Sequence, residues 1–183
     1  MDKESPAKEN VMLIYLQMIP EVPEQQRFCR IYALYRDLMF YTARRILSDP
    51  RDAEDAVQEA FFAIARNIGC LSDPESPRTR TYAVIVTERK AIDISRRLKR
   101  QGESELLEDA MGVEFSEPTG ELARAIAKLP PRDREFVILK YAEGYTNREL
   151  AGMLDLSYAA VRSIDHRMKQ RLRALLHEEG VEL

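Results

Sequence analysis

Cationic and hydrogen-bonding side chains open the last predicted helix of the chain, which starts after Ser157. Before it, Thr146-Asn147-Arg148-Glu149 forms a capping box that starts a short helix, and Asp155-Leu156-Ser157 forms a tight turn. This order is typical of a helix-turn-helix, whose second helix enters the DNA major groove, although a helical hairpin with a solvated basic face would look the same. Candidate base contacts are Tyr158, Arg162, Ser163 and His166, and candidate phosphate contacts are Arg167 and Lys169.

A second basic segment runs from Arg78 to Arg100 and holds eight Lys and Arg residues against two acidic ones, a net charge of +6. Tyr82 lies among these cations. Single-stranded DNA binding uses such a mixture, because bases stack on the ring while the cations follow the phosphates. The simpler interpretation is a solvated basic helix in which Tyr82 is a core residue.

Carboxylates cluster where another helix is predicted to begin, at Asp49, Asp52, Glu54, Asp55 and Glu59. They could hold a metal or perform acid-base chemistry, but the helix macrodipole also favours acidic residues in the first turns. The chain has no Glu-x-x-His pair, Gly-rich phosphate loop or nucleophile motif. We therefore predict no catalysis, metal or cofactor, and expect this acidic face, with Gln58 and Phe62 beside it, to dock a protein partner.

Apolar periodicity predicts the helices that position these groups. One helix runs from Phe28 to Leu47, and Asp49 caps a second helix whose first residue is Pro50. The Gly and Pro residues of 67–77 predict a loop. Helical spacing over 79–98 predicts one long helix, although the segment is rich in β-branched residues.

The C-terminal third is predicted as four helices. The first ends at Pro130-Pro131, the second ends at Gly144, and the last two form the helix-turn-helix. The buried stripe of the last helix is predicted as Val161, Ile164, Met168, Leu172 and Leu175.

Composition limits the class of protein. The 183 residues are 45% apolar and 32% charged, with a net charge of −3, as in soluble folded proteins. The longest apolar run has six residues against the ~20 that span a bilayer, and the start lacks the pattern of a signal peptide. Two cysteines and two histidines give no disulfide framework or zinc-finger spacing. We expect a cytoplasmic protein.

The charge pattern also predicts the domain organisation. Residues 101–118 hold six acidic residues and no Lys or Arg, which indicates an acidic linker between two basic segments. We predict an all-α chain of two small helical modules. Its parts are an N-terminal segment (1–23), a helical domain (24–100), the linker (101–118) and a helix-turn-helix domain (119–183).

Three stretches in register carry a resemblance to a known family: DAEDAVQEAFFAIARNI, RTRTYAVIVTERKAIDISRRLKR and LPPRDREFVILKYAEGYTNRELAGMLDLSYAAVRSIDHRMKQRLRALL. They resemble regions two and four of bacterial RNA polymerase sigma factors of the extracytoplasmic-function (ECF) class, in the sigma-70 family. The resemblance implies a transcription initiation factor that binds core RNA polymerase through its β′ and β subunits and directs it to promoter DNA. An anti-sigma factor is a further candidate partner.

The resemblance assigns site residues by motif position. It implies that the β′ coiled coil is docked by Asp55, Gln58, Glu59 and Phe62. It implies that the segment that opens and reads the minus-ten element contains Tyr82, Arg89, Lys90, Asp93, Arg96 and Arg97, with the 67–77 loop near an extruded base. It implies that the minus-thirty-five element is read as duplex by Ser157, Tyr158, Arg162, Ser163, His166, Arg167 and Lys169.

Several positions depart from the family pattern. Tyr82 stands where the family commonly has Trp, and Arg89 where it has Asn. Ile164 removes an expected DNA contact, and Asp165 adds a charge that we expect to disfavour a nearby phosphate. Asp155 replaces the usual Gly of the turn, where a left-handed conformation is expected. These departures bear on the promoter sequence more than on the function.

Two other functions can be written from the residues. One is a helix-turn-helix transcriptional regulator whose N-terminal helices dimerise or sense a ligand, but such a regulator has no need for the basic segment around Tyr82. The other is a carboxylate-metal enzyme, which requires metal ligands that this sequence does not assemble.

Overall fold

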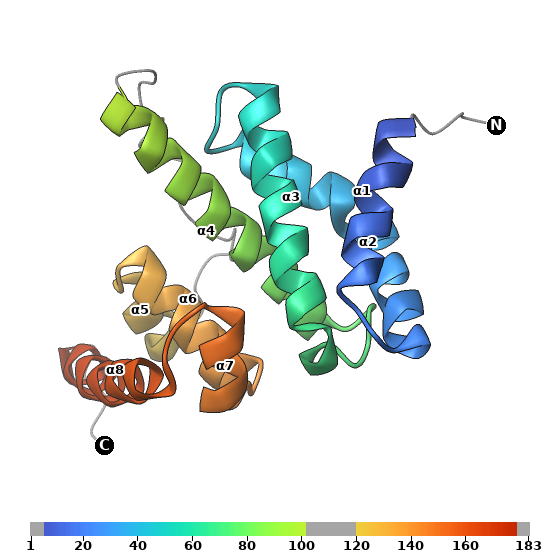
Figure 1. Ribbon diagram of the computed structural model, residues 1–183. Helices are drawn as coiled ribbons and strands as arrows, with labels where there is room; N and C mark the ends of the chain where they lie inside the picture. Colours follow the sequence, from blue (N-terminus) through green and yellow to red (C-terminus); the bar gives the residue numbers. More distant parts are fainter. Residues whose placement is uncertain (1–5, 102–119, 179–183) are drawn as a thin grey trace. The chain divides into compact units, whose positions relative to one another are not determined.

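The chain forms two compact units in a computed structural model. The structure describes residues 6–101, in the first unit, and 120–178, in the second. All regular structure in these residues is helical, which confirms the predicted all-α class (Figure 1). The predicted linker lies outside them, except for Gln101 at the end of a helix.

Over residues 6–101, the first unit is built from four helices and one short turn. They are α1 (Pro6–Gln17), α2 (Val22–Arg44), α3 (Pro50–Arg66), the 3₁₀ turn η1 (Ile68–Cys70) and α4 (Pro77–Gln101). Helices α2, α3 and α4 pack against one another, and α1 lies against α3. Their shared core contains Phe28, Ile31, Met39, Phe61, Ile64, Tyr82 and Ile85.

An aromatic cluster joins α1 to this core. Tyr15 is 1% exposed, and its ring centroid lies 4.9 Å from Phe62, 5.3 Å from Phe28 and 6.0 Å from Phe61. Burial raises the pKa of the Tyr15 hydroxyl well above its ordinary value, with a smaller contribution from Tyr32. Helix α1 was not predicted, although the apolar run of 11–16 forms its C-terminal half.

The helix boundaries of the first unit follow local chemistry. Helix α2 begins before the predicted Phe28 because Pro23 fits its first turn, and it ends at Arg44, whose guanidinium donates to the carbonyls of Leu47 (2.8 Å) and Ser48. The predicted cap of α3 is confirmed, since the Asp49 carboxylate accepts from the Arg51 amide at 2.7 Å. Helix α4 is continuous, as predicted.

The part of the second unit that the structure describes, residues 120–178, contains four helices with one irregular turn. They are α5 (Glu121–Ala127), α6 (Pro131–Val137), which continues into the π-helical turn η2 (Ile138–Ala142), α7 (Asn147–Met153) and α8 (Tyr158–Glu178). The π turn was not predicted, and in it the Glu143 amide donates to the Ile138 carbonyl at 2.9 Å. Gly144 ends this helix with φ +73°, as predicted.

Candidate polymerase and nucleic-acid interfaces

The helix-turn-helix predicted for the second unit is present as α7, a turn and α8 (Figure 1). Both halves of the capping box form, because the Glu149 amide donates to Thr146 Oγ1 at 3.2 Å and the Thr146 amide donates to Glu149 Oε2 at 2.7 Å. Asp155 has φ +55°, the left-handed conformation expected in the turn. The Ala160 amide donates to Ser157 Oγ at 3.1 Å, so Ser157 caps α8.

The outward face of α8 carries the side chains predicted to read DNA. All seven of them are exposed: Ser157, Tyr158, Arg162, Ser163, His166, Arg167 and Lys169. Val161 and Met168 are fully buried on the opposite face, whereas Ile164, Leu172 and Leu175 of the predicted stripe are only half-buried. The buried stripe therefore directs the polar residues of the first three turns away from the unit.

Asp165 corrects one expectation from the sequence. We expected its charge to lie near DNA phosphate, but its side chain points inward and the residue is 9% exposed. Its Oδ1 accepts from the Tyr141 hydroxyl at 2.5 Å, its Oδ2 lies 3.6 Å from Lys169 Nζ, and it also hydrogen-bonds the Asn147 side chain. Burial opposes ionisation of this carboxyl, but the Tyr141 hydrogen bond and the Lys169 ammonium outweigh it and lower the pKa.

The basic segment of the first unit lies along α4. Arg96 and Arg97 are exposed, as is Asp93, while Arg89 and Lys90 are half-buried. Asp93 and Arg96 line a shallow hollow with Lys99 and Arg100. The C-terminal half of α4 therefore offers a cationic surface to a polyanion.

Tyr82 does not belong to this surface. Its side chain is fully buried in the core between the helices of the first unit. A base cannot stack on a ring that no solvent reaches, so burial favours the simpler of the two interpretations, in which Tyr82 is a core residue. In the sequence, Tyr82 is an aromatic residue among cationic ones. In the helix, its position directs the ring into the core and away from these cations.

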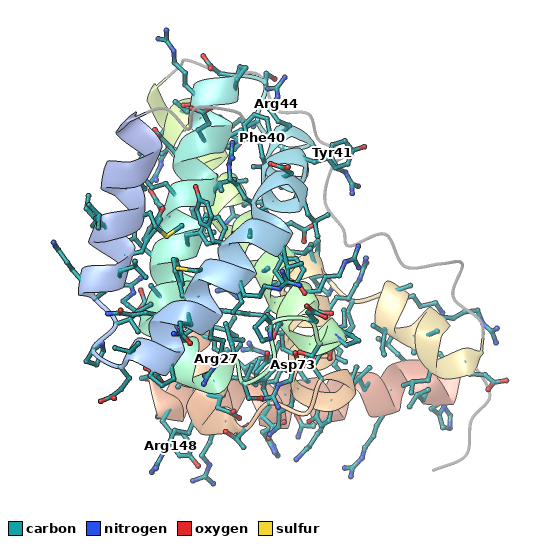
Figure 2. The ribbon with its side chains drawn as sticks, turned by 90° about the vertical axis from the view of Figure 1, so that its right-hand side faces the viewer. Arg27, Phe40, Tyr41, Arg44, Asp73 and Arg148 are labelled. Carbon is teal, nitrogen blue, oxygen red and sulfur yellow. The ribbon has the colours of Figure 1, made fainter. Side chains whose placement is uncertain are left out.

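Three tethers from α2 hold the 67–77 loop, and none of them was predicted. The Tyr35 hydroxyl donates to the Pro74 carbonyl at 2.6 Å, Arg30 Nη2 lies 2.6 Å from Glu75 Oε1, and Arg27 Nη1 donates to the Ile68 carbonyl at 3.3 Å. In Figure 2, Arg27 and Asp73 lie near the same end of α2.

The loop also closes on itself through Asp73. Its carboxylate accepts from the Glu75 amide at 2.9 Å, and its carbonyl accepts from the hydroxyls of Ser76 (2.9 Å) and Thr79 (2.6 Å). The loop is therefore an ordered structure anchored to α2 and to the start of α4.

We expect Tyr35→Phe to loosen this loop without unfolding the unit. The change removes one hydrogen bond worth about 0.5–1.5 kcal/mol, so amide exchange over 71–76 should accelerate roughly 2- to 12-fold. Hydrogen exchange followed by mass spectrometry checks this. Tyr41→Phe is the matched control, because Tyr41 lies on the same helix and is 67% exposed (Figure 2). Equal exchange in both variants would show that the loop does not depend on the Tyr35 hydroxyl.

The acidic face lies on α3 beside α1. Asp55 is exposed, and Gln58, Glu59 and Phe62 are half-buried. Glu59 Oε2 lies 3.6 Å from Lys90 Nζ, so the predicted docking face and the basic helix α4 share an ion pair. Tyr15 of α1 packs its ring on Phe62.

A groove continues this face toward α2. It has a volume of about 380 Å³, with Asp55 and Gln58 on its α3 side, Phe40 and Asp37 on its α2 side and Tyr15 at α1. In Figure 2, Phe40 lies near the end of α2 that carries Tyr41 and Arg44. The acidic face therefore borders a groove that is lined by charged as well as apolar side chains, which sequence periodicity did not predict.

A second groove lies within the other unit. Its volume is about 420 Å³, and its lining is mostly apolar. The lining residues are Leu122, Ile126, Val137, Ile138, Tyr141, Ala142, Lys169, Leu172, Arg173 and Leu176. Leu122 stands on the wall of this groove and is 55% exposed.

In residues 6–101 and 120–178, no helix is both long and apolar enough to cross a membrane. In the same residues, no group of three or more His, Cys, Asp or Glu side chains is arranged to hold a metal ion.

Comparison with known proteins identifies both units. The family model "Sigma-70 region 2" matches residues 31–101, and "Sigma-70, region 4" matches residues 119–172. The two matches together cover more than half of the chain, one in each unit.

Two curated relatives agree with these matches. The ECF RNA polymerase sigma factor SigE of Mycolicibacterium smegmatis is 28% identical over 159 residues, which are 81% of this chain and 61% of that protein. The ECF RNA polymerase sigma factor SigW of Bacillus subtilis is 24% identical over 175 residues, 85% of this chain and 91% of that protein. A solved structure of the sigma factor RpoE in complex with the anti-sigma factor NepR from Bartonella quintana is 17% identical with a TM-score of 0.40, covering 80% of this chain and 94% of that chain. The chain therefore belongs to the sigma-70 family, as an ECF-class sigma factor that directs RNA polymerase to promoters.

Proposed function

We propose that the two units divide promoter recognition between them. The second unit reads the minus-thirty-five element as duplex through α8, and the first unit docks core polymerase through α3 and binds the minus-ten strand along α4. The observation that carries this proposal is the separation of polar and apolar side chains on α8. The residues predicted to read DNA are exposed, while Val161 and Met168 are buried. An exposed polar face that starts at a capped N-terminus suits insertion into a major groove.

The minus-ten role rests on the cationic half of α4 and on the anchored 67–77 loop. Arg96 and Arg97 face solvent and can follow the phosphates of a separated strand. The loop is tied to α2 through Tyr35 and Arg30, so it offers a rigid rim beside which a base can be extruded. Extrusion costs a few kcal/mol per base, which contacts to the separated strand can offset.

We assign core polymerase contacts to both units. The acidic face of α3, with Asp55 exposed above a groove, fits a basic helical surface of the β′ subunit. The apolar groove of the second unit, bordered by Lys169 and Arg173, fits an apolar helix of the β subunit. Core polymerase performs the chemistry, and the sigma factor, which is not an enzyme, works where the polymerase does, in the cytoplasm.

Arg162→Ala is expected to relax recognition of the upstream element. Arg162 is exposed near the start of α8, and a bidentate contact to guanine contributes ~1–3 kcal/mol of discrimination, so preference at one base pair should fall roughly 5- to 150-fold. Binding of holoenzyme to promoter duplexes with single base-pair changes measures this. Arg167→Ala is the matched control, since loss of a phosphate contact should weaken all sequences alike. If Arg162→Ala leaves every preference unchanged, α8 does not read the duplex through this residue.

A further inference from the structure

The recognition helix carries one buried carboxylate in its reading segment, Asp165. Tyr141 reaches it from the π turn η2, Asn147 from the first residue of α7, and Lys169 from the next turn of α8. Each carboxylate oxygen has a close partner, with Tyr141 Oη 2.5 Å from Oδ1 and Lys169 Nζ 3.6 Å from Oδ2. A buried charge persists only when it is paired in this way. The two helices of the motif and the helix before them therefore meet at one side chain.

In its reading segment, residues 157–169, α8 buries two apolar side chains fully. Val161 and Met168 bury their side chains on either side of Asp165, but apolar burial is nearly independent of direction. Hydrogen bonds to Asp165 are directional and hold one angle. The difference is large enough to matter at DNA: with side chains, a helix has a radius of about 5–6 Å, so a rotation of about 20° moves a side-chain end by about 2 Å. A base contact tolerates only a few tenths of an ångström.

We propose that Asp165 and Tyr141 are positioning residues that fix the rotation of α8 and thereby decide which of its side chains face the bases. The inference rests on the proposed function, in which α8 reads the minus-thirty-five element. It adds a specificity determinant that does not touch DNA. It also assigns the Lys169 ammonium to Asp165, whose Oδ2 lies 3.6 Å away, in place of a DNA phosphate.

The decisive variant replaces the polar pair by apolar groups of similar size, as Asp165→Leu with Tyr141→Phe. Replacing a buried ionic group by packed apolar side chains is often neutral or stabilising, so the thermal midpoint of the chain should stay equal or rise. Holoenzyme reconstituted from core polymerase and the full chain is then allowed to bind a pool of promoter duplexes randomised over the upstream element. Sequencing the bound fraction should show discrimination reduced about fivefold or more, the loss of at least one base contact.

The salt dependence of promoter binding gives a readout that a purely structural role would not move. In the wild-type chain, Lys169→Ala should leave the slope of log K against log salt unchanged, whereas Arg167→Ala should reduce its magnitude by about one. Once Asp165→Leu releases Lys169, its ammonium is free to reach phosphate. The slope should then steepen by about one, and adding Lys169→Ala should reverse that change.

The controls separate this inference from the function on which it rests. If Arg162→Ala also leaves discrimination intact, α8 does not read the element and the proposed function fails. If Arg162→Ala relaxes discrimination while the apolar pair retains it, positioning by Asp165 is wrong and the proposed function stands. If the double variant does not fold, Tyr141→Phe alone decides, because it removes a single hydroxyl. Wild-type discrimination in that variant overturns the inference. Reduced discrimination with an unchanged thermal midpoint supports it.

Discussion

A chain that carries Asp55→Lys and Glu59→Lys is expected to lose its association with core RNA polymerase. The two changes place cations on the acidic face of α3, opposite a partner surface that the proposal takes to be basic. Like charges that face each other across an interface cost several kcal/mol, so affinity should fall roughly 100-fold or more. Co-purification of the tagged chain with core polymerase, without DNA, measures the loss.

The fold should survive this double change, because Asp55 is exposed and Glu59 is half-buried, and neither lies in the buried stripe of α3. The ion pair between Glu59 and Lys90 is at risk, because Glu59→Lys would set two ammonium groups side by side. Adding Lys90→Glu restores an ion pair of opposite polarity while the docking face stays reversed. We expect this charge-swap variant to fold like the wild type and still fail to bind polymerase.

A control of equal charge tests whether the position or the net charge matters. Glu121→Lys with Glu178→Lys changes the chain by the same number of charges at exposed positions in the other unit. This control should co-purify with polymerase at the wild-type level. Retention of the α3 variant at that level would show that polymerase docks elsewhere, with the groove of the second unit as the next surface to test.

Features encoded within a few residues could be predicted from the sequence. The Asp49 cap, the Thr146–Glu149 capping box and the left-handed Asp155 each depend on neighbours in the chain, and the structure confirms all three. The single long α4 was predictable for a similar reason, because its helical period continues through the β-branched stretch.

Features that depend on distant partners could not be predicted. Tyr35 and Pro74 are 39 residues apart, and Tyr141 and Asp165 are 24 apart, so no local pattern pairs them. Charge type misled the interpretation of Asp165, since an acidic residue on a basic helix is expected to face solvent unless partners pair it inside. The apolar run of 11–16 was a usable signal for α1. Nothing in the sequence, however, indicated that Tyr15 of this helix contacts Phe62.

Tyr82→Ala is expected to destabilise the first unit by about 3–5 kcal/mol, the usual cost of deleting a large buried aromatic side chain. Tyr82 is 0% exposed and belongs to the core that α2, α3 and α4 share. Destabilisation should follow the volume removed, so Tyr82→Phe should cost least and Tyr82→Leu should lie between Phe and Ala. Urea-induced unfolding followed by circular dichroism measures the series.

The same three variants separate a core role from a stacking role at the minus-ten element. Under the core role, the Leu variant opens promoters as well as wild type at temperatures where it is folded, because the buried ring never meets a base. Under the stacking role, the Leu variant fails even when folded, while the Phe variant succeeds, because stacking needs an aromatic face worth ~1–3 kcal/mol per base. Permanganate reactivity of unpaired thymines in the reconstituted holoenzyme distinguishes the two roles.

Because burial separates the Tyr82 ring from solvent, we expect promoter opening to follow the folded fraction of the protein across all three variants. A folded Leu variant that cannot open promoters would mean that α4 exposes this ring when it binds DNA.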